Sequence, residues 1–126
     1  MKSLFFILMI APSFMMVDSN LDEISTAIRN GDATALSEFF DQNVEVAILD
    51  DEDTYDKAQA KAVVQSFFAK HKPTNFSQVH KGASKGKDAQ YCIGNLKSGK
   101  ESFRVYLFLK VSNGKHIIQE LRFDKE

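Results

Sequence analysis

The chain has 126 residues, of which 44% are hydrophobic, and its 16 Lys and Arg residues nearly balance 17 Asp and Glu residues. This length predicts a single domain, and the hydrophobic content is too high for a disordered chain. The formal net charge of -1 provides no basic excess for binding phosphate backbones, so nucleic acid is not an expected partner. The composition alone names no reaction.

The first residues are typical of a secretory signal peptide. A positively charged start leads into a mainly apolar run over residues 3–17, which contains one proline and is followed by the polar residues 18–20. This run is shorter than the about 20 apolar residues of a membrane-spanning helix, so an uncleaved anchor is the weaker alternative. We place cleavage after Ser19, which predicts a signal peptide at 1–19, a single domain at 20–126, and export to the periplasm or the cell exterior.

Cys92 is the single cysteine of the chain. A chain with one cysteine forms no internal disulfide, so burial of apolar side chains is expected to hold the domain together, even in an oxidising compartment. Because Cys92 lies far from the predicted cleavage site, no lipid anchor is expected, and the mature protein is predicted to be soluble. No general base is positioned beside this thiol, so we interpret it as a packing residue.

Three helices are predicted ahead of the last strands. Apolar residues spaced three or four apart predict a helix over about 21–30, ended by a glycine. Asp32 can cap a second, short helix that includes the phenylalanine pair at 39–40. Asp56 can cap a third helix, which runs to about Lys70 and carries a wide apolar stripe.

The remaining elements are predicted strands. Alternating apolar residues predict a strand over about 44–49, and the acidic run at 50–53 is interpreted as an exposed turn before a short returning segment that contains Tyr55. Beyond the third helix the apolar period changes to two. This change predicts four long antiparallel strands at about 75–82, 88–96, 101–111 and 115–124.

Two glycine-bearing connections determine how the last three strands are expected to pair. A two-residue turn at Asn113 and Gly114 would place apolar residues of one strand beside charged residues of the next. A three-residue loop at 112–114 instead aligns Val105 with Leu121. The same choice at the preceding connection, with a loop at 97–99, sets Tyr91 opposite Val105, so we predict three-residue loops at both connections.

This register predicts which side chains face the helices. The core face is expected to carry Tyr91, Ile93, Phe103, Val105, Leu107, Leu109, Ile117, Leu121 and Phe123, interrupted by Gln119. The opposite face is expected to carry Cys92, Leu96, Arg104, Tyr106, Phe108, Ile118, Glu120 and Arg122, a mixture that reads as a second contact surface. Strands this long coil as they twist, so the sheet is expected to curl strongly around the helices and to leave a conical space.

The order of helices and strands looks like the nuclear transport factor 2-like, or cystatin-like, α+β cone. Stretches across the chain also resemble a family of small exported bacterial proteins described only as a domain of unknown function (family 4783). The matching stretches are 24–32, 55–60, 67–68, 80–82, 91–96 and 103–106. The resemblance covers essentially all of 21–124 and implies this fold, N-terminal helices packed in a strongly curled antiparallel sheet. It implies no activity, because that family has none assigned. Proteins with this cone include ketosteroid isomerase, scytalone dehydratase and many binding modules, so the fold does not choose among these functions.

Several motifs fit an ordinary structural role better than a functional one. The acidic run at 50–53 lacks the glycine and the distant glutamate of a calcium loop, so it is interpreted as a solvated turn. Residues 82–87 read GASKGK, but their spacing and the following strand do not match a phosphate-binding loop. The three histidines, His71, His80 and His116, have no metal-ligand spacing. No metal, cofactor or catalytic residue is therefore assigned.

The predicted cone interior is the leading candidate site. Its polar groups are expected to be Tyr55, His80, Tyr91 and Gln119, which would line a cavity for a small apolar or amphipathic molecule. We therefore predict a non-catalytic module that binds such a molecule, or a protein partner, through the cone mouth. The alternative is a cone-type lyase or isomerase with His80 as base and Tyr91 as donor, but no inward carboxylate completes that acid-base pair.

The outer face of the sheet is the second candidate. The side chains Arg104, Tyr106, Phe108 and Ile118 are expected to form an isologous homodimer interface. This interface is compatible with either interpretation of the cone interior.

Overall fold

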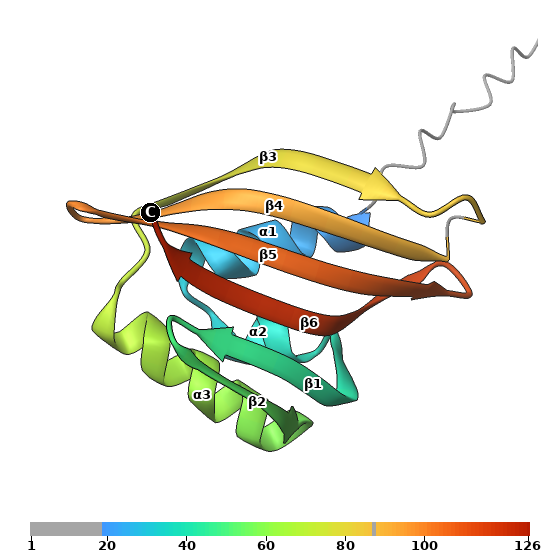
Figure 1. Ribbon diagram of the computed structural model, residues 1–126, viewed down its shortest axis with the longest axis horizontal. Coiled ribbons are helices and arrows are strands. Elements are labelled where there is room, and N and C mark those ends of the chain that lie inside the picture. Colours follow the sequence, from blue (N-terminus) through green and yellow to red (C-terminus); the bar gives the residue numbers. More distant parts are fainter. Residues whose placement is uncertain (1–18, 87) are drawn as a thin grey trace, which may run out of the picture.

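The computed structural model describes residues 19–86 and 88–126, which form an α+β fold (Figure 1). The helices are α1 (Ser19–Asn30), α2 (Ala33–Ser37) and α3 (Lys57–Lys70). The strands are β1 (Phe40–Ile48), β2 (Asp51–Asp56), β3 (Asn75–Ala83), β4 (Ala89–Ser98), β5 (Glu101–Ser112) and β6 (Lys115–Lys125). The predicted signal peptide lies, apart from Ser19, outside the described residues, so its cleavage stays a prediction.

The second and third helices begin where capping residues were predicted. Asp32 accepts a hydrogen bond from the backbone N–H of Ala35 at 3.0 Å, and Asp56 accepts one from Gln59 at 2.8 Å. The second helix is shorter than predicted, because α2 ends at Ser37 and the phenylalanine pair at 39–40 lies outside it. The reason is tertiary: Phe40 begins β1, where it pairs with a residue of the distant strand β6.

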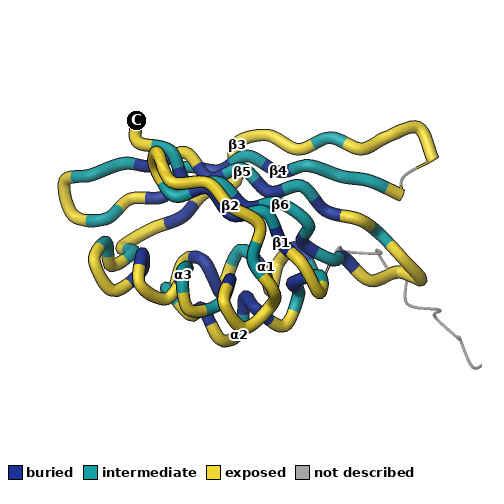
Figure 2. Tube along the Cα trace, turned by 60° about the horizontal axis from the view of Figure 1, so that its bottom comes forward, coloured by how far each residue is buried: buried dark blue, intermediate teal, exposed yellow. Residues whose placement is uncertain are grey.

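The six strands form one sheet in the order β2-β1-β6-β5-β4-β3. The last four strands are antiparallel, as predicted, whereas β1 pairs with β6 in parallel, so the sheet is mixed. Figure 2 shows the strands as one layer and the helices as another, with buried residues on the facing sides. We call the sheet face that lies against the helices the inner face and the opposite one the outer face. The strong curl expected from strand length stays a prediction.

Most of the acidic run, Asp51 to Asp53, belongs to a strand, and only Asp50 lies in the turn. Asp51 pairs with Ile48, and β2 then continues antiparallel to β1 along the edge of the sheet. The turn itself consists of Leu49 and Asp50, and Leu49 has a positive φ of 58°. Exposed carboxylates suit this strand because charged side chains on an edge discourage pairing with another chain.

The predicted pairing of β4 with β5 is wrong. These strands are joined by the two residues Gly99 and Lys100, and Gly99 has a φ of 61°. The shorter turn moves β4 by an odd number of residues relative to the prediction, and this inverts its faces. Cys92 and Leu96 therefore point inward and are buried, whereas Tyr91 and Ile93, which were predicted in the core, lie on the outer face.

The connection between β5 and β6 is also a two-residue turn, formed by Asn113 and Gly114 with φ values of 53° and 76°. The predicted three-residue loop is therefore wrong, and Ile118 points inward in place of Ile117. Beyond this point a bulge at Gln119 shifts the register by one residue. Because of the bulge, Leu121 and Phe123, which follow it in β6, face the core as predicted.

The space between the two layers is filled by side chains. The fully buried residues of the central strands are Leu96, Phe103, Val105, Leu107, Leu109, Ile118, Leu121 and Phe123. The helices contribute Ile24, Ile28 and Leu36 with similar burial. Cys92 is 2% exposed, and desolvation raises the pKa of its thiol, which agrees with a packing role on the face opposite to the one predicted.

Candidate functional site

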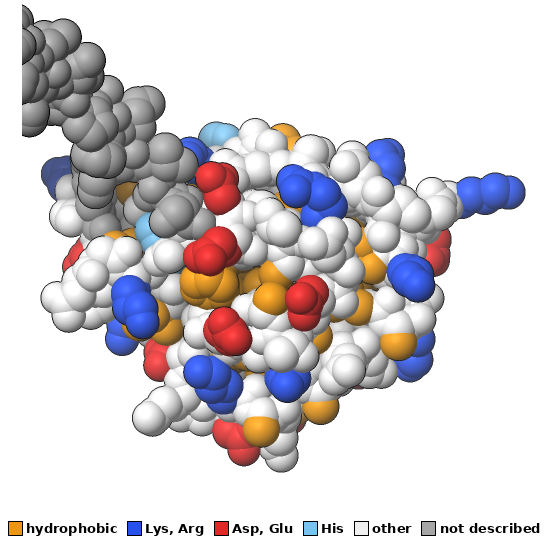
Figure 3. Space-filling view, turned by 180° about the vertical axis from the view of Figure 1, so that it is seen from behind, with side chains coloured by type: hydrophobic (Ala, Val, Ile, Leu, Met, Phe, Trp, Pro, Cys, Tyr) orange, Lys and Arg blue, Asp and Glu red, His pale blue; other side chains and the backbone are white. Residues whose placement is uncertain are grey.

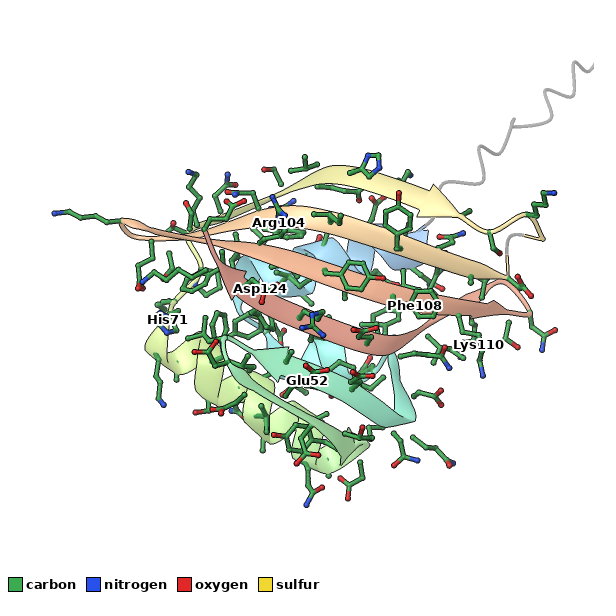
Figure 4. The ribbon with its side chains drawn as sticks, in the orientation of Figure 1. Glu52, His71, Arg104, Phe108, Lys110 and Asp124 are labelled. Carbon is green, nitrogen blue, oxygen red and sulfur yellow. The ribbon has the colours of Figure 1, made fainter. Side chains whose placement is uncertain are left out.

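The outer face carries a band of apolar side chains that the helices do not cover. We define the outer band as Tyr91, Ile93, Tyr106, Phe108 and Ile117, all half-buried and all on the outer side of β4, β5 and β6. Figure 4 views this face, with Phe108 near the middle of β5 and Arg104 and Lys110 to either side along the same strand. Within the band the Tyr91 and Tyr106 rings stack with their centroids 6.5 Å apart.

His80 and Tyr91 do meet, but on the outer face. The Tyr91 hydroxyl lies 3.0 Å from Nε2 of His80, at hydrogen-bonding distance, and Tyr91 also covers Gly82 on the neighbouring strand. His80 is exposed to solvent. The prediction that both side chains line the interior is wrong, because the inverted register of β4 turns Tyr91 outward and the pairing of β3 follows β4.

A group of carboxylates lies beside the outer band on β1, β2 and β6. Arg122 Nη1 lies 3.4 Å from a Glu52 oxygen and 3.2 Å from a Glu120 oxygen. Glu45 shares a hydrogen bond with Glu52, and this bond together with the charge of Glu120 raises the pKa of Glu45. The same hydrogen bond and Arg122 lower the pKa of Glu52. Three carboxylates with one arginine leave this side of the face acidic.

Gln119 and Ile118 are not where the sequence placed them. The Gln119 side chain donates a hydrogen bond from Nε2 to Asp41 Oδ2 at 3.1 Å, and this bond lowers the pKa of Asp41. It therefore ties the bulge of β6 to the start of β1. Ile118 is fully buried, so the prediction that it belongs to an outer interface is wrong.

The interior holds an aromatic cluster where a cavity was predicted. The ring of Phe67 stacks on Phe123 at 4.3 Å and meets Phe103 edge-on at 5.2 Å. Phe68 contacts Phe123 at 5.9 Å. These four side chains are at most 5% exposed. The enclosed cavity expected between the sheet and the helices is therefore occupied by the protein itself.

An open cleft lies instead between α3 and the hairpin of β1 and β2. It has a volume of about 490 Å³ and is lined by apolar and polar side chains. Tyr55 is the one predicted ligand-binding residue that lines it, while His80, Tyr91 and Gln119 lie elsewhere. We call it the α3 cleft.

His71 and Glu101 form a pair at this cleft that the sequence analysis missed. His71 follows the last residue of α3, and its Nδ1 donates to Glu101 Oε1 at 2.8 Å. This hydrogen bond, with a second from Lys125, lowers the pKa of the Glu101 carboxyl. The His71 ring also packs against Phe67 at 4.9 Å. Only the tertiary structure brings together two residues that lie so far apart in the chain.

The helix side shows a second surface feature. Figure 3 shows acidic side chains around an apolar patch on this face. A groove of about 310 Å³ lies over α1 and α2, and its lining includes Asp22, Glu23, Asp32, Glu38 and Phe39. An acidic rim around one half-exposed aromatic residue is also what an ordinary solvated helix face presents, so we assign it no ligand.

The described part of the chain holds neither a metal-binding group nor a membrane-crossing helix. Among residues 19–86 and 88–126, no group of His, Cys, Asp or Glu side chains is arranged to hold a metal ion. No helix in the same residues has the length and apolar character needed to cross a membrane.

The arrangement of helices against one face of a long sheet is the nuclear transport factor 2-like fold. A protein of unknown function from Silicibacter pomeroyi with this fold matches with a TM-score of 0.63 at 13% identity, covering 86% of this chain and 91% of that one. The family model described as Domain of unknown function (DUF4783) matches residues 21–124, and the chain belongs to this family.

Two further structures resemble this one. A DUF4783 family protein from Bacteroides ovatus is 30% identical with a TM-score of 0.77, and the match covers 82% of this chain and 93% of that one. A putative ketosteroid isomerase from Kribbella flavida has a TM-score of 0.59 at 12% identity, covering 86% of this chain and 76% of that one, which is similarity of fold alone. No curated protein matches the chain.

Proposed function

We propose that this protein is a non-catalytic interaction module that pairs with a second copy of itself through the outer band. The observation that carries the proposal is the uncovered row of aromatic and branched side chains in the middle of the sheet. Apolar patches rimmed by polar residues mark interaction sites on proteins. A two-fold symmetric pairing would bury this band against itself.

Charged side chains border the band. The acidic group at Glu45, Glu52 and Glu120 lies on one side, on β1, β2 and β6. Arg104 is exposed on the outer face of β5, with its Nη2 3.6 Å from Glu126 Oε2. A polar rim around an apolar centre is the usual arrangement of a protein interface.

Replacing Phe108 with glutamate tests this pairing. The Phe108→Glu substitution places a charge in the buried centre of the proposed interface, next to Glu120 on the adjacent strand. Loss of a well-packed contact together with an unpaired buried charge is expected to weaken association by about 100-fold or more. We expect native mass spectrometry and light scattering to show a dimer for the wild type and a folded monomer for the variant.

The matched control is Gln65→Glu, which adds the same charge at an exposed position of α3 on the helix side. This variant should remain dimeric, and circular dichroism should show the same helix and strand content for all three proteins. A monomeric wild type, or a Phe108→Glu variant that stays dimeric, would contradict the proposed pairing.

The residues predicted for the enzymatic alternative do not lie in a water-excluding pocket. A lyase or isomerase of this fold needs a base inside a water-excluding pocket. The proposed base, His80, is exposed and its partner Tyr91 belongs to the outer band. The similarity to a putative ketosteroid isomerase therefore brings no reaction to this chain.

We also propose that the protein is exported, to the periplasm or the exterior, after cleavage behind Ser19. The charged start and the mainly apolar run at 3–17 support this proposal. We expect the intact mass of protein purified from the source cells to correspond to a chain that begins at Asn20. A mass that includes the residues from Met1 onward would contradict export by cleavage.

A further inference from the structure

The α3 cleft has a defined shape because of how the chain enters the helix. Strand β2 leads directly into α3, so the helix runs back along the hairpin and its last residues lie near the hairpin turn. Val63, Phe67 and Lys70 line the cleft from one side of α3, at the spacing of consecutive helical turns. Ile48 and Tyr55 line it from the hairpin.

The walls of the cleft are apolar and partly aromatic. Phe67 is held rigidly by its stacking on Phe123, and Tyr55 is half-buried on the side of β2 that faces α3. Leu49 overhangs the cleft from the turn, where it is 40% exposed with a φ of 58°. A bulky residue in the left-handed region is uncommon, and such strain concentrates at functional positions.

The mouth of the cleft offers hydrogen-bond acceptors. Asp50 and Asp51 line it from the turn, and both are exposed. His71 lines it from the end of α3, with Nδ1 already donating to Glu101. In the neutral ring this arrangement leaves Nε2 as an acceptor, and no residue among 19–86 and 88–126 bonds to it.

We infer that the α3 cleft binds a small amphipathic amine. The two carboxylates and the free acceptor of His71 suit a head group that donates hydrogen bonds and carries positive charge. The half-buried ring of Tyr55 and the side chains of Ile48 and Val63 suit an apolar body, and the face of Tyr55 can also attract a cation. The volume of about 490 Å³ lies in the range of small-molecule sites.

One side chain of the lining opposes this ligand. Lys70 is exposed at the end of α3, and its ammonium has no hydrogen-bond or ion-pair partner among the described residues. Because Asp50 and Asp51 line the same cleft, the carboxylates of the lining outnumber its ammonium group. Removing its charge should therefore strengthen the binding of an amine and weaken that of a carboxylate.

The test uses two probes that share a fluorophore and differ in charge. Dansylcadaverine carries a primary amine and dansylglycine a carboxylate, and fluorescence polarisation follows the binding of each to the mature protein. We expect dansylcadaverine to bind more tightly. Asp51→Asn should weaken the binding of dansylcadaverine by roughly two- to fivefold, because an exposed ion pair contributes only a little binding energy. Lys70→Met should strengthen this binding by a similar factor.

Matched variants distinguish binding in the cleft from non-specific binding elsewhere on the protein. Ser66→Trp fills the cleft from the exposed side of α3 and should weaken the binding of dansylcadaverine by at least about tenfold. Gln65→Trp adds the same ring outside the cleft and should leave this binding unchanged. Asp53→Asn, on the same strand and outside the lining, is the control for Asp51→Asn. Equal or tighter binding of dansylglycine, or binding that Ser66→Trp leaves unchanged, would overturn the inference.

This inference does not depend on the pairing of two copies. Tyr55 faces α3, while its neighbours in the strand, such as Thr54, belong to the outer side of the sheet. The Phe108→Glu monomer should therefore bind dansylcadaverine as the wild type does. A variant that loses dimerisation and keeps amine binding distinguishes the failure of one proposal from that of the other.

Discussion

Replacing Phe67 with alanine is expected to lower the free energy of unfolding by about 3–5 kcal/mol, the usual cost of removing a buried phenylalanine ring. Phe67 touches Phe68, Phe103 and Phe123, and it is 3% exposed. These neighbours belong to different elements, so no single shift can close the space that the ring leaves. A loss of this size is a large part of the about 5–15 kcal/mol that stabilises a typical domain.

Urea unfolding followed by circular dichroism measures this effect. Phe67→Leu serves as the control, because leucine retains much of the buried volume and should cost clearly less. The same alanine substitution also opens the back wall of the α3 cleft, which Phe67 lines. If Phe67→Ala unfolds with nearly the wild-type midpoint, the aromatic cluster does not contribute to stability in the way that its packing indicates.

Replacing Gly94 with alanine is expected to destabilise the sheet by about 2–3 kcal/mol, the cost of overpacking a well-filled core. A Cβ at this position would lie 2.3 Å from Cζ of Phe76 and 2.9 Å from the backbone oxygen of Ser77. Neither neighbour can move cheaply. The Phe76 ring is buried in the core at 2% exposure, and the Ser77 oxygen belongs to the paired strand β3.

Gly86→Ala is the matched control for this prediction. Its added methyl would come no closer than 3.5 Å to the side chain of Asp88, so we expect little change in the unfolding midpoint. Shortening the opposing ring, as in Gly94→Ala combined with Phe76→Leu, should recover part of the loss, because residues in direct contact have non-additive effects. Equal stability of the Gly94→Ala and wild-type proteins would show that β3 can move away from β4.

Much of the secondary structure follows from local features of the sequence. Asp32 and Asp56 cap the helices predicted from them, and the change to a two-residue period after Pro73 marks the start of the long strands. A cap acts within one helical turn and alternation within one strand. Neither needs information from a distant part of the chain, and so both can be predicted from the sequence.

The candidate site was predicted less well, because it depends on strand register. The choice between two- and three-residue turns decided the face of Tyr91, and the wrong turn length turned it inward. The alternation in β4 is weak evidence, since apolar residues such as Cys92 and Ile93 stand on both of its faces. Packing against the helices decides which face of β4 is buried, and that packing is a tertiary property.

The sequence by itself determined the helices, the long strands and the α+β class of this protein, because caps and apolar periods act over a few residues. The tertiary structure alone decided which faces of β4 and β6 are buried, and it brought His71 to Glu101 beside the hairpin. It also placed Phe40, which was expected in a helix, at the start of β1, where it pairs with Ile118 of the parallel strand β6. The physical reason is that register, bulges and contacts between distant elements are selected by the fit of the whole core, which no local pattern contains.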